Sequence, residues 1–228
     1  MKERTNIAKT IHLPAQSGNS ACLERMRRGY SREAYLELVN KIRDTLPDVA
    51  LTSDFIAGFC GETDQEHMDT ISLMKIVKYS FCFMYPYSMR EKTKAYHRLK
   101  DDVPNEIKNK RYLEMVDTFR NCAAELNKTK LNQIHLVLID KISKRSLNEY
   151  SGRNDNNTIV HFEKTELPFI NNINDYKNLN SIEKKMPLIG DYVACKLTQS
   201  TSHSFRSIPL FTCNMQIFSQ LKNSCLLE

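Results

Sequence analysis

The first 127 residues alternate three times between a short apolar run and an amphipathic stretch. The runs TIHLP, VALTSDFIAGF and SFCFMYPYS predict strands, because they are rich in β-branched and aromatic residues and stop near Pro or Gly. In the third run Phe81, Phe83, Tyr85 and Tyr87 occupy every second position, so their side chains should share one face. Strand starts roughly 35 residues apart, with helices between them, are typical of parallel βα units.

Helix signals fill the intervals between these strands. Apolar residues recur at three- and four-residue steps over 31–46, which predicts one buried helix face. A shorter helix over 20–28 should end at Gly29, in the position after a helix that favours glycine. The sequence TDQE at 63–66 has the form of a capping box, and Asp102 is expected to cap a long helix.

The pattern changes after residue 127, where short apolar runs are separated by turn-rich segments. Their number and spacing predict a small antiparallel β-barrel over 128–213. An Asn- and Lys-rich stretch over 170–186 reads as an exposed loop insertion, and residues 214–228 form a tail with only a loose apolar pattern. The predicted strands are 134–140, 158–162, 191–198 and 203–213.

Length and composition fit a packed protein of one large domain or two ordinary ones, since 41% of the 228 residues are hydrophobic. No run approaches the roughly 18 apolar residues of a membrane span, and no signal peptide is evident, so we expect a soluble intracellular protein without a membrane partner. The net charge of +6 fits a polyanion-binding protein. Residues 128–228 hold 13 Lys and Arg against 9 Asp and Glu, so the excess leans towards the predicted barrel.

The cysteines do not form a metal-binding pattern. No two of the seven lie within four residues of each other, which argues against a zinc site built from Cys-x-x-Cys pairs and against a local iron–sulfur loop. We expect most of them to be reduced, partly buried small hydrophobic residues.

Candidate ligand-binding residues gather where the three strands end, which is where reactive groups lie in parallel βα architectures. Gln16, Ser17 and Asp54 supply hydrogen-bond donors and acceptors, and Arg90 supplies a cationic fork suited to a carboxylate or phosphate. Each alone could be structural, such as a polar turn residue or a solvated surface arginine. Because three strand ends carry such residues together, a shared ligand site is favoured.

These stretches also resemble a known family. HLPAQSG, SDFIAGFCGET and YSMREKTKAYHRLKDDVP are similar to the last part of the radical S-adenosylmethionine domain of MiaB-type tRNA methylthiotransferases. VLIDKISKRS and SGRNDNN resemble the opening of the RNA-binding TRAM barrel that follows it. Within this family, the residues of these motifs are most similar to those of the mitochondrial branch that is associated with a cyclin-dependent-kinase regulatory subunit. The resemblance covers about residues 10–164 and resumes at GDYVACKLT.

The resemblance implies an α/β fold in which 1–127 forms the last three βα units of an open, TIM-like radical SAM barrel, and 128–213 forms the TRAM barrel. The chain then corresponds to a C-terminal fragment. The family's two 4Fe-4S clusters are held by a Cys-x3-Cys-x2-Cys loop and by three cysteines of a preceding domain, and this chain has no matching cysteines. The last predicted strand, HSFRSIPLFTC, lacks the glycine usual in the family, which argues against full closure of the small barrel.

The resemblance further implies a reaction: methylthiolation of C2 of N6-isopentenyladenosine next to the tRNA anticodon, with S-adenosylmethionine and two 4Fe-4S clusters as cofactors. Gln16, Ser17, Asp54 and Arg90 would face the cofactor, and no residue of this chain is expected to be catalytic or to bind a metal. The TRAM pattern implies a second set of residues, which would contact the tRNA anticodon stem-loop through its phosphates: Lys144, Arg145, Arg153, Asn154 and Asn157.

Three functions remain open from the sequence. The first is part of a mitochondrial tRNA methylthiotransferase that is inactive alone, with a cytoplasmic location as the alternative. The second is an RNA-binding module without catalysis. The third is an interaction protein that acts on a protein kinase regulator, which only the name of the family branch suggests.

Overall fold

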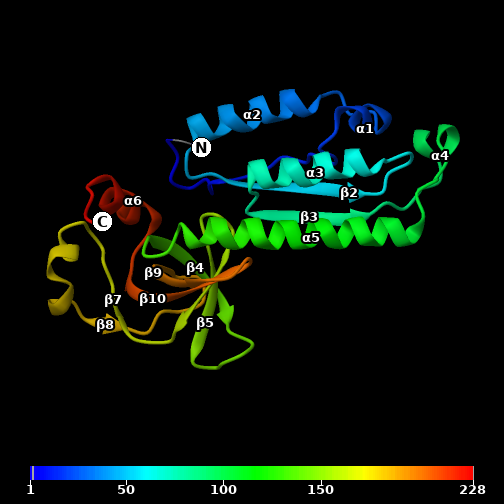
Figure 1. The fold of residues 1–228 in the computed structure, drawn as a ribbon. Coiled ribbons are helices and arrows are strands. Elements are labelled where there is room, and N and C mark those ends of the chain that lie inside the picture. The colour runs from blue at the N-terminus through cyan, green and yellow to red at the C-terminus, as the bar shows by residue number, and fades with distance from the viewer. Residues whose placement is uncertain (2, 228) are drawn as a thin grey trace. The chain divides into compact units, whose positions relative to one another are not determined.

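A computed structural model describes residues 1 and 3–227 and divides the chain into two compact units (Figure 1). One unit comprises 11–123, and the other comprises 1–10 together with the residues from 124 onward. We predicted a division after residue 127. Helix α5 (Asn105–Lys128) runs through both positions, so no loop marks the boundary. Among the described residues, no helix is long and apolar enough to cross a membrane.

The unit 11–123 is built on a three-stranded sheet in the order β1-β2-β3, with helices packed on one face. Strands β2 and β3 run parallel, as predicted for βα units, and Gln16 and Phe55 form a parallel bridge after β1. The elements are β1 (Thr10–His12), α1 (Ser20–Arg25), α2 (Arg32–Thr45), β2 (Ala50–Ala57), α3 (Asp64–Val77), β3 (Phe81–Pro86), α4 (Lys94–Arg98) and α5.

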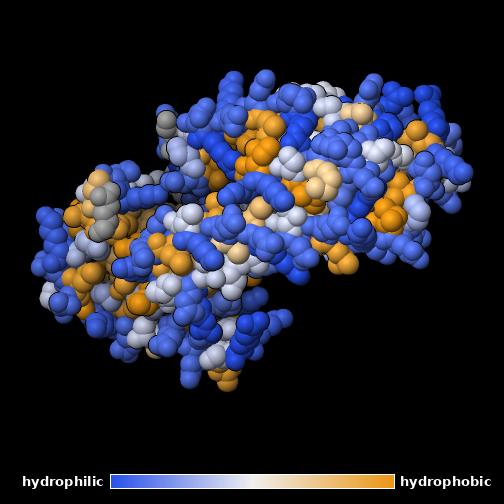
Figure 2. Space-filling model, in the orientation of Figure 1, coloured by the Kyte–Doolittle hydropathy of each residue, from blue (hydrophilic) through white to orange (hydrophobic). Residues whose placement is uncertain are grey.

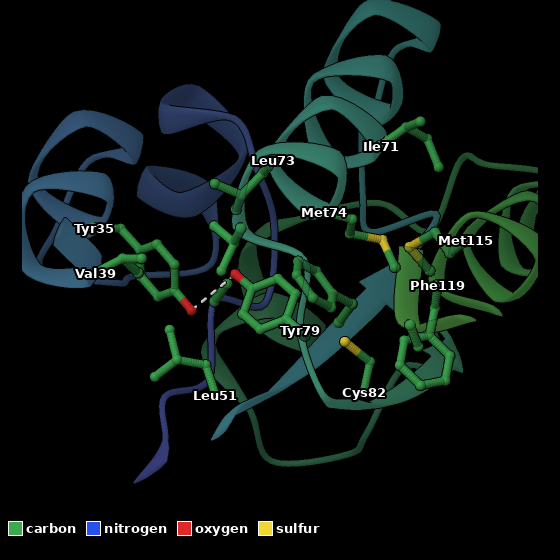
Figure 3. Close-up of a cluster of buried hydrophobic side chains, with 14 of the residues drawn as sticks. Tyr35, Val39, Leu51, Ile71, Leu73, Met74, Tyr79, Cys82, Met115 and Phe119 are labelled. Atoms are coloured by element: carbon green, nitrogen blue, oxygen red, sulfur yellow. Dashed lines mark hydrogen bonds between the residues drawn. The ribbon is translucent and has the colours of Figure 1, made fainter. Parts of the chain in front are cut away.

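The core of this unit lies between the sheet and helices α2, α3 and α5. The hydroxyl of Tyr79 donates a hydrogen bond to the hydroxyl of Tyr35 at 3.0 Å, which satisfies a polar group inside the apolar cluster (Figure 3). Met115 and Phe119 of α5 close the other side of the cluster. Burial of these large side chains is the main stabilising contribution to the unit.

The other face of the sheet carries the alternating aromatic residues. Phe81, Phe83 and Tyr85 share this face, as predicted, and they are 38%, 46% and 55% exposed. The strand register places Thr52 of β2 beside Phe81 and Asp54 beside Phe83. We call this the open face of the sheet: Thr52, Asp54, Ile56, Phe81, Phe83 and Tyr85.

Two helix boundaries differ from the prediction. Helix α1 ends at Arg25, because the N–H groups of Arg27 and Arg28 bond back to the helix while Arg27 takes a left-handed φ of 60°. The left-handed residue that ends the helix is therefore Arg27 and not Gly29. Helix α5 begins three residues after Asp102, whose carboxylate accepts a hydrogen bond from the Gly61 N–H at 2.7 Å instead of capping the helix. The predicted capping box of α3 is confirmed.

The second unit contains a closed five-stranded barrel in the order β10-β6-β5-β4-β9. The expectation of incomplete closure was wrong. Strand β10 pairs with β6 in parallel and with β9 in antiparallel orientation, and two register shifts after Arg206 and Pro209 bend the strand without a glycine. Four of the five pairings are antiparallel, as predicted, and the closing one is parallel. The strands are β4 (Ile134–Ile142), β5 (Glu149–Asn154), β6 (Ile159–Glu163), β9 (Tyr192–Ser200) and β10 (Ser204–Thr212).

The 170–186 stretch is not simply an exposed loop, because Ile170 is buried and Tyr176 stacks edge-on against Phe211 of β10. The tail is also folded. Its helix α6 buries Ile217 and Leu221 in the same apolar cluster. Both segments are folded because a few of their apolar residues pack into this cluster. The remaining elements are β7 (Leu167–Pro168), the 3₁₀ helix η1 (Asp175–Ser181), β8 (Lys184–Lys185) and α6 (Met215–Asn223).

Candidate functional site

Gln16, which follows β1, lies beside Asp54, which is within β2. The Gln16 N–H donates to the Asp54 carbonyl at 2.8 Å, and the Gln16 carbonyl accepts from the Ile56 N–H at 3.0 Å. Gln16 has a left-handed φ of 66° and is only 7% exposed, yet its side-chain amide makes no hydrogen bond to the described residues. A strained, largely buried residue with an unused amide is a candidate ligand contact.

Asp54 points from β2 onto the open face. Its carboxylate lies 3.3 Å from Nε2 of His12, and Nδ1 of that ring lies 2.9 Å from the Thr52 hydroxyl. Both side chains remain partly exposed, at 45% for His12 and 31% for Asp54. The open face therefore presents a hydrogen-bonded polar pair beside Phe83.

Ser17 is placed differently from Gln16, towards the helices. It is 1% exposed, its hydroxyl lies 3.4 Å from that of Thr70, and it accepts a hydrogen bond from the Asn19 N–H. Ser17 thus holds the turn that carries Gln16.

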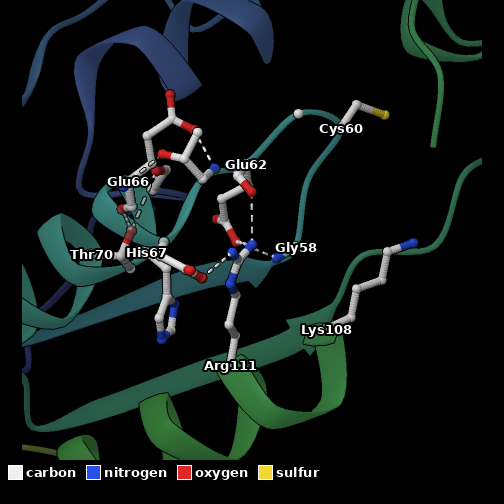
Figure 4. A network of polar contacts seen from close by, with 12 residues as sticks. Gly58, Cys60, Glu62, Glu66, His67, Thr70, Lys108 and Arg111 are labelled. Atoms are coloured by element: carbon white, nitrogen blue, oxygen red, sulfur yellow. Dashed lines mark hydrogen bonds and ion pairs between the residues drawn. The ribbon is translucent and has the colours of Figure 1, made fainter. Parts of the chain in front are cut away.

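A buried ionic network fixes the loop that follows β2 (Figure 4). The Glu62 carboxylate accepts from the Gly58 N–H at 2.7 Å and from Arg111 of α5 at 3.0 Å, and Arg111 also donates to Asp64 at 2.7 Å. Burial raises the pKa of Glu62, against the opposing effect of the Gly58 N–H and the Arg111 guanidinium. The network anchors both ends of the loop to α5.

Lys108 lies on the same face of α5 as Arg111, about one turn earlier, and also contacts the loop that follows β2. Its ammonium group donates to both oxygens of Asp101 at 2.6 and 2.7 Å and lies 5.4 Å from the centre of the Tyr87 ring. A Cβ at Gly58 would lie 2.4 Å from the Lys108 side chain, and Gly58 has a φ of 73°. Only glycine therefore fits that position.

Sequence reasoning missed Glu62, Lys108 and Arg111 as structural residues. A signal was present, because 108, 111 and 115 follow the spacing of one helix face and Met115 is fully buried. Arg90, which was predicted, is exposed and lines a cavity at the end of β3 together with Ile56 and Tyr87.

The predicted RNA-contacting residues lie on two neighbouring turns of the barrel. Lys144 and Arg145 are exposed on the connection between β4 and β5, and neither forms an ion pair among the described residues. Arg153 is held in place: its guanidinium donates to the carbonyl and side-chain oxygens of Asn157 at 3.0 and 3.1 Å and lies 3.4 Å from Asp140.

Asn154 is buried and organises the turn between β5 and β6. Its side-chain oxygen accepts from the N–H groups of Asn156 and Thr158 at 3.2 and 3.0 Å, and its amide nitrogen lies 3.3 Å from the His135 ring. The structure thus brings Arg153 and Asn157 together on the surface and places Asn154 beneath them.

The described residues do not fit an iron–sulfur cluster. Six of the described cysteines are buried and none of the six forms a disulfide, and burial raises the pKa of the Cys22 thiol to about 11, which disfavours a thiolate ligand. No group of three or more Cys, His, Asp or Glu among the residues that the structure describes could hold a metal ion. The free amide of Gln16 and the exposed carboxylate of Asp54 do fit a polar organic ligand.

Comparison with known proteins agrees with this geometry. Residues 1–74 match the radical SAM superfamily. The chain is 51% identical over 204 residues to the human mitochondrial tRNA methylthiotransferase CDK5RAP1, covering 90% of this chain and 33% of that protein. It is 51% identical over 164 residues to a CDK5RAP1-like protein of Caenorhabditis elegans, covering 72% of this chain and 30% of that protein.

A bacterial protein is similar over the same share of the chain, at lower identity. The tRNA-2-methylthio-N(6)-dimethylallyladenosine synthase of Flavobacterium johnsoniae is 41% identical over 206 residues, which cover 90% of this chain and 39% of that protein. The chain thus spans between about 30% and 40% of the length of these relatives. Because a match over 90% of the chain must include residues of both the sheet and the barrel, both units are similar to proteins named as tRNA methylthiotransferases, and residues 1–74 match the radical SAM superfamily.

Proposed function

We propose that this chain forms part of an enzyme that adds a methylthio group to an adenosine of tRNA. The 51% identity to a mitochondrial tRNA methylthiotransferase over 90% of the chain carries the proposal. The name of the bacterial relative supports a finer version, in which the substrate is N6-isopentenyladenosine (N6-dimethylallyladenosine) of tRNA and the modified atom is C2. We further propose that this adenosine lies next to the anticodon. The names of the mammalian relatives support mitochondrial tRNA as the substrate.

In this proposal the sheet supplies the last three βα units of an open radical SAM barrel, and its open face borders the reaction chamber. Gln16, Asp54 and Arg90 would face S-adenosylmethionine: the amide and carboxylate would bind its polar groups, and the guanidinium would bind its carboxylate. When bound, this cofactor supplies the methyl group and the radical chemistry, while the protein orients it. Ser17 would keep the turn of Gln16 rigid. No described residue is assigned as a cluster ligand.

The barrel would bind tRNA through its phosphates. Lys144 and Arg145 offer two exposed cations that form no ion pair within the part of the chain that the structure describes, and Arg153, oriented by Asn157, offers a third on the next turn. Binding would release counterions, so affinity should fall steeply as salt is raised. Asn154 would contribute by fixing the turn and not by touching RNA.

The test of this role is binding of a labelled tRNA anticodon stem-loop to the chain at several salt concentrations. The variant Lys144→Gln/Arg145→Gln should weaken binding and reduce the slope of log Kd against log salt by about 1 to 2. The matched control, Lys177→Gln/Lys196→Gln, removes the same charge from exposed positions of the same unit and should leave most of the affinity. If both variants lose the same affinity, the effect depends only on net charge, and the assignment of Lys144 and Arg145 as phosphate contacts is wrong.

A second function, RNA binding without catalysis, is favoured by the closed barrel and by the misfit of the described residues to a cluster. The two functions differ in one outcome. Disrupting the coding sequence of this chain removes the methylthio group from tRNA only if the chain serves the enzyme.

A further inference from the structure

The unit 11–123 contains a cationic cavity in which Arg90 is the only charged residue that belongs to the proposed cofactor contacts. It has a volume of about 520 Å³ and lies where the end of α1, the end of β2 and helix α4 meet. We call it the α1–α4 groove. The positively charged residues that line it are Arg25, Arg27, Arg28, Arg90, Lys94 and Arg98, and Glu24 is its one acidic residue.

Most of this charge is uncompensated within the protein. Arg25 is bound to Glu66, with both terminal nitrogens within 2.8 Å of the carboxylate. The other five cations form no ion pair among the described residues, and all five are exposed. Like charges gathered around one concave surface repel each other and focus a positive potential there. A ligand with several negative charges would remove this repulsion.

Apolar side chains form the floor of the groove. The rings of Phe59 and Tyr87 meet edge to face at 4.8 Å between centres, and Leu99, directly after α4, packs against the same cluster. Figure 2 shows apolar side chains lying among hydrophilic ones around α4 on the face in view. A simple inorganic anion would use the rim alone, whereas a nucleic acid strand carries both phosphates and apolar base surfaces.

Arg27 provides an independent observation. It takes the left-handed position that ends α1, with a φ of 60°, where glycine is strongly favoured. An arginine there costs stability relative to glycine, and strain of this kind is concentrated at functional positions. The same turn places Arg27 and Arg28 on the groove.

We propose that the α1–α4 groove binds single-stranded RNA, with Arg27, Arg28 and Arg98 holding successive phosphates and the Tyr87 side of the floor receiving a base. The inference rests on the proposed function, because it assigns a second contact to the same RNA substrate. This contact is made by the sheet unit and does not depend on Lys144 or Arg145 of the barrel. The arginines are positioning residues for the RNA and take no part in chemistry.

The test measures binding of a short fluorescein-labelled oligouridylate and of the anticodon stem-loop to the full chain. The variant Arg28→Gln/Lys94→Gln/Arg98→Gln should weaken oligouridylate binding at least tenfold and reduce the salt slope by about 2. Its control, Lys41→Gln/Lys75→Gln/Lys110→Gln, removes the same charge from exposed positions outside the groove. Equal behaviour of the two triple variants would overturn the proposal.

Arg27→Gly separates a binding role from a structural one. Removing the side chain relieves the left-handed strain, so the melting temperature should stay the same or rise while oligouridylate binding weakens several-fold. A variant that is less stable but binds RNA as well as the wild type would contradict the proposal. Inorganic tripolyphosphate serves as a competitor: if it displaces the oligouridylate at equal phosphate concentration, the groove is a general anion site and the assignment to RNA fails.

The barrel variant Lys144→Gln/Arg145→Gln distinguishes the two proposals. If only the groove assignment is wrong, the barrel variant loses affinity for the stem-loop and the groove variant matches its control. If only the barrel assignment is wrong, the groove variant still loses affinity and the barrel variant matches its own control.

Discussion

The guanidinium of Arg25 donates to both carboxylate oxygens of Glu66, at 2.8 Å to Oε1 and 2.7 Å to Oε2. Glu66 is also the last residue of the capping box and accepts the Thr63 N–H at 2.9 Å. Arg25 further donates to the Cys60 carbonyl at 3.2 Å. One ion pair therefore joins the end of α1, the loop after β2 and the start of α3.

This ion pair predicts a pH-dependent loss of stability in Arg25→Gln. The hydrogen bonds from Arg25, with help from the Thr63 N–H, hold the pKa of Glu66 below its ordinary value of 4.5. A carboxyl with a lowered folded-state pKa stabilises the fold above its ordinary pKa and loses that contribution as pH falls through the folded-state value. We expect the variant to lose about 2 kcal/mol of unfolding free energy at pH 7, and the difference to shrink below pH 4.5.

Urea unfolding at a series of pH values checks this prediction. Arg120→Gln is the control, because the pair of Arg120 with Asp117 is exposed and 3.9 Å long, so its loss should change stability by less than about 0.5 kcal/mol. A constant difference between Arg25→Gln and the wild type from pH 7 to pH 3 would show that the Glu66 charge is not involved.

Arg111→Leu should be more damaging, because it leaves Glu62 buried without its cation. Removing one partner of a buried pair costs roughly 3–5 kcal/mol. Burial already raises the pKa of Glu62, so the penalty is fully present above its folded-state pKa and is relieved as pH falls through it. The double variant Glu62→Gln/Arg111→Leu should recover part of the loss at pH 7. If the double variant is no more stable than Arg111→Leu, the buried charge is not the cause.

Gly152 of β5 tests the packing of the barrel. A Cβ at Gly152 of β5 would lie 2.2 Å from the Leu138 carbonyl oxygen and 2.8 Å from a methyl group of Val137, so Gly152→Ala should cost about 1–3 kcal/mol or more. Gly29→Ala is the matched control, since a Cβ there meets nothing within 4 Å. Thermal unfolding followed by near-ultraviolet circular dichroism compares the two. Equal melting temperatures would mean that the β4–β5 pairing is looser than described.

The chain alone is predicted to bind no 4Fe-4S cluster. Its buried cysteines come from separate elements, and burial raises the pKa of Cys22 to about 11 and that of Cys213 to about 12. A cluster needs several thiolates held close together. Anaerobic reconstitution with iron and sulfide should leave less than about one iron per chain. An iron content near four per chain that is lost on Cys60→Ser would contradict the prediction.

Local signals explain most of what the sequence predicted correctly. The capping box at Thr63 and Glu66 satisfies its N–H groups within four residues, and the alternation through Phe81 and Phe83 depends only on strand geometry. The structure places Gln16 just after β1, beside β2, because the strands run parallel, whereas Asp54 lies within β2 and not, as the sequence had suggested, at its end.

Contacts between distant parts of the chain were not predictable in the same way. Glu62 and Arg111 meet across 49 positions of sequence, and Arg111 is one of several charged residues on its helix. The closure of the barrel depends on the register shift after Pro209, where a bend replaces the glycine that the family pattern led us to expect. The burial of Asn154 was also not predictable from its own position, because it depends on contacts with Asn156, Thr158 and His135 together.

The most direct measurement is nucleoside mass spectrometry of mitochondrial tRNA from cells in which the coding sequence for this chain is disrupted. The account predicts that 2-methylthio-N6-isopentenyladenosine disappears and that N6-isopentenyladenosine accumulates in its place. Restoring the gene should return the methylthio group, and restoring it with Lys144→Gln/Arg145→Gln should return less of it. An unchanged ratio of the two nucleosides after disruption would contradict the proposed function.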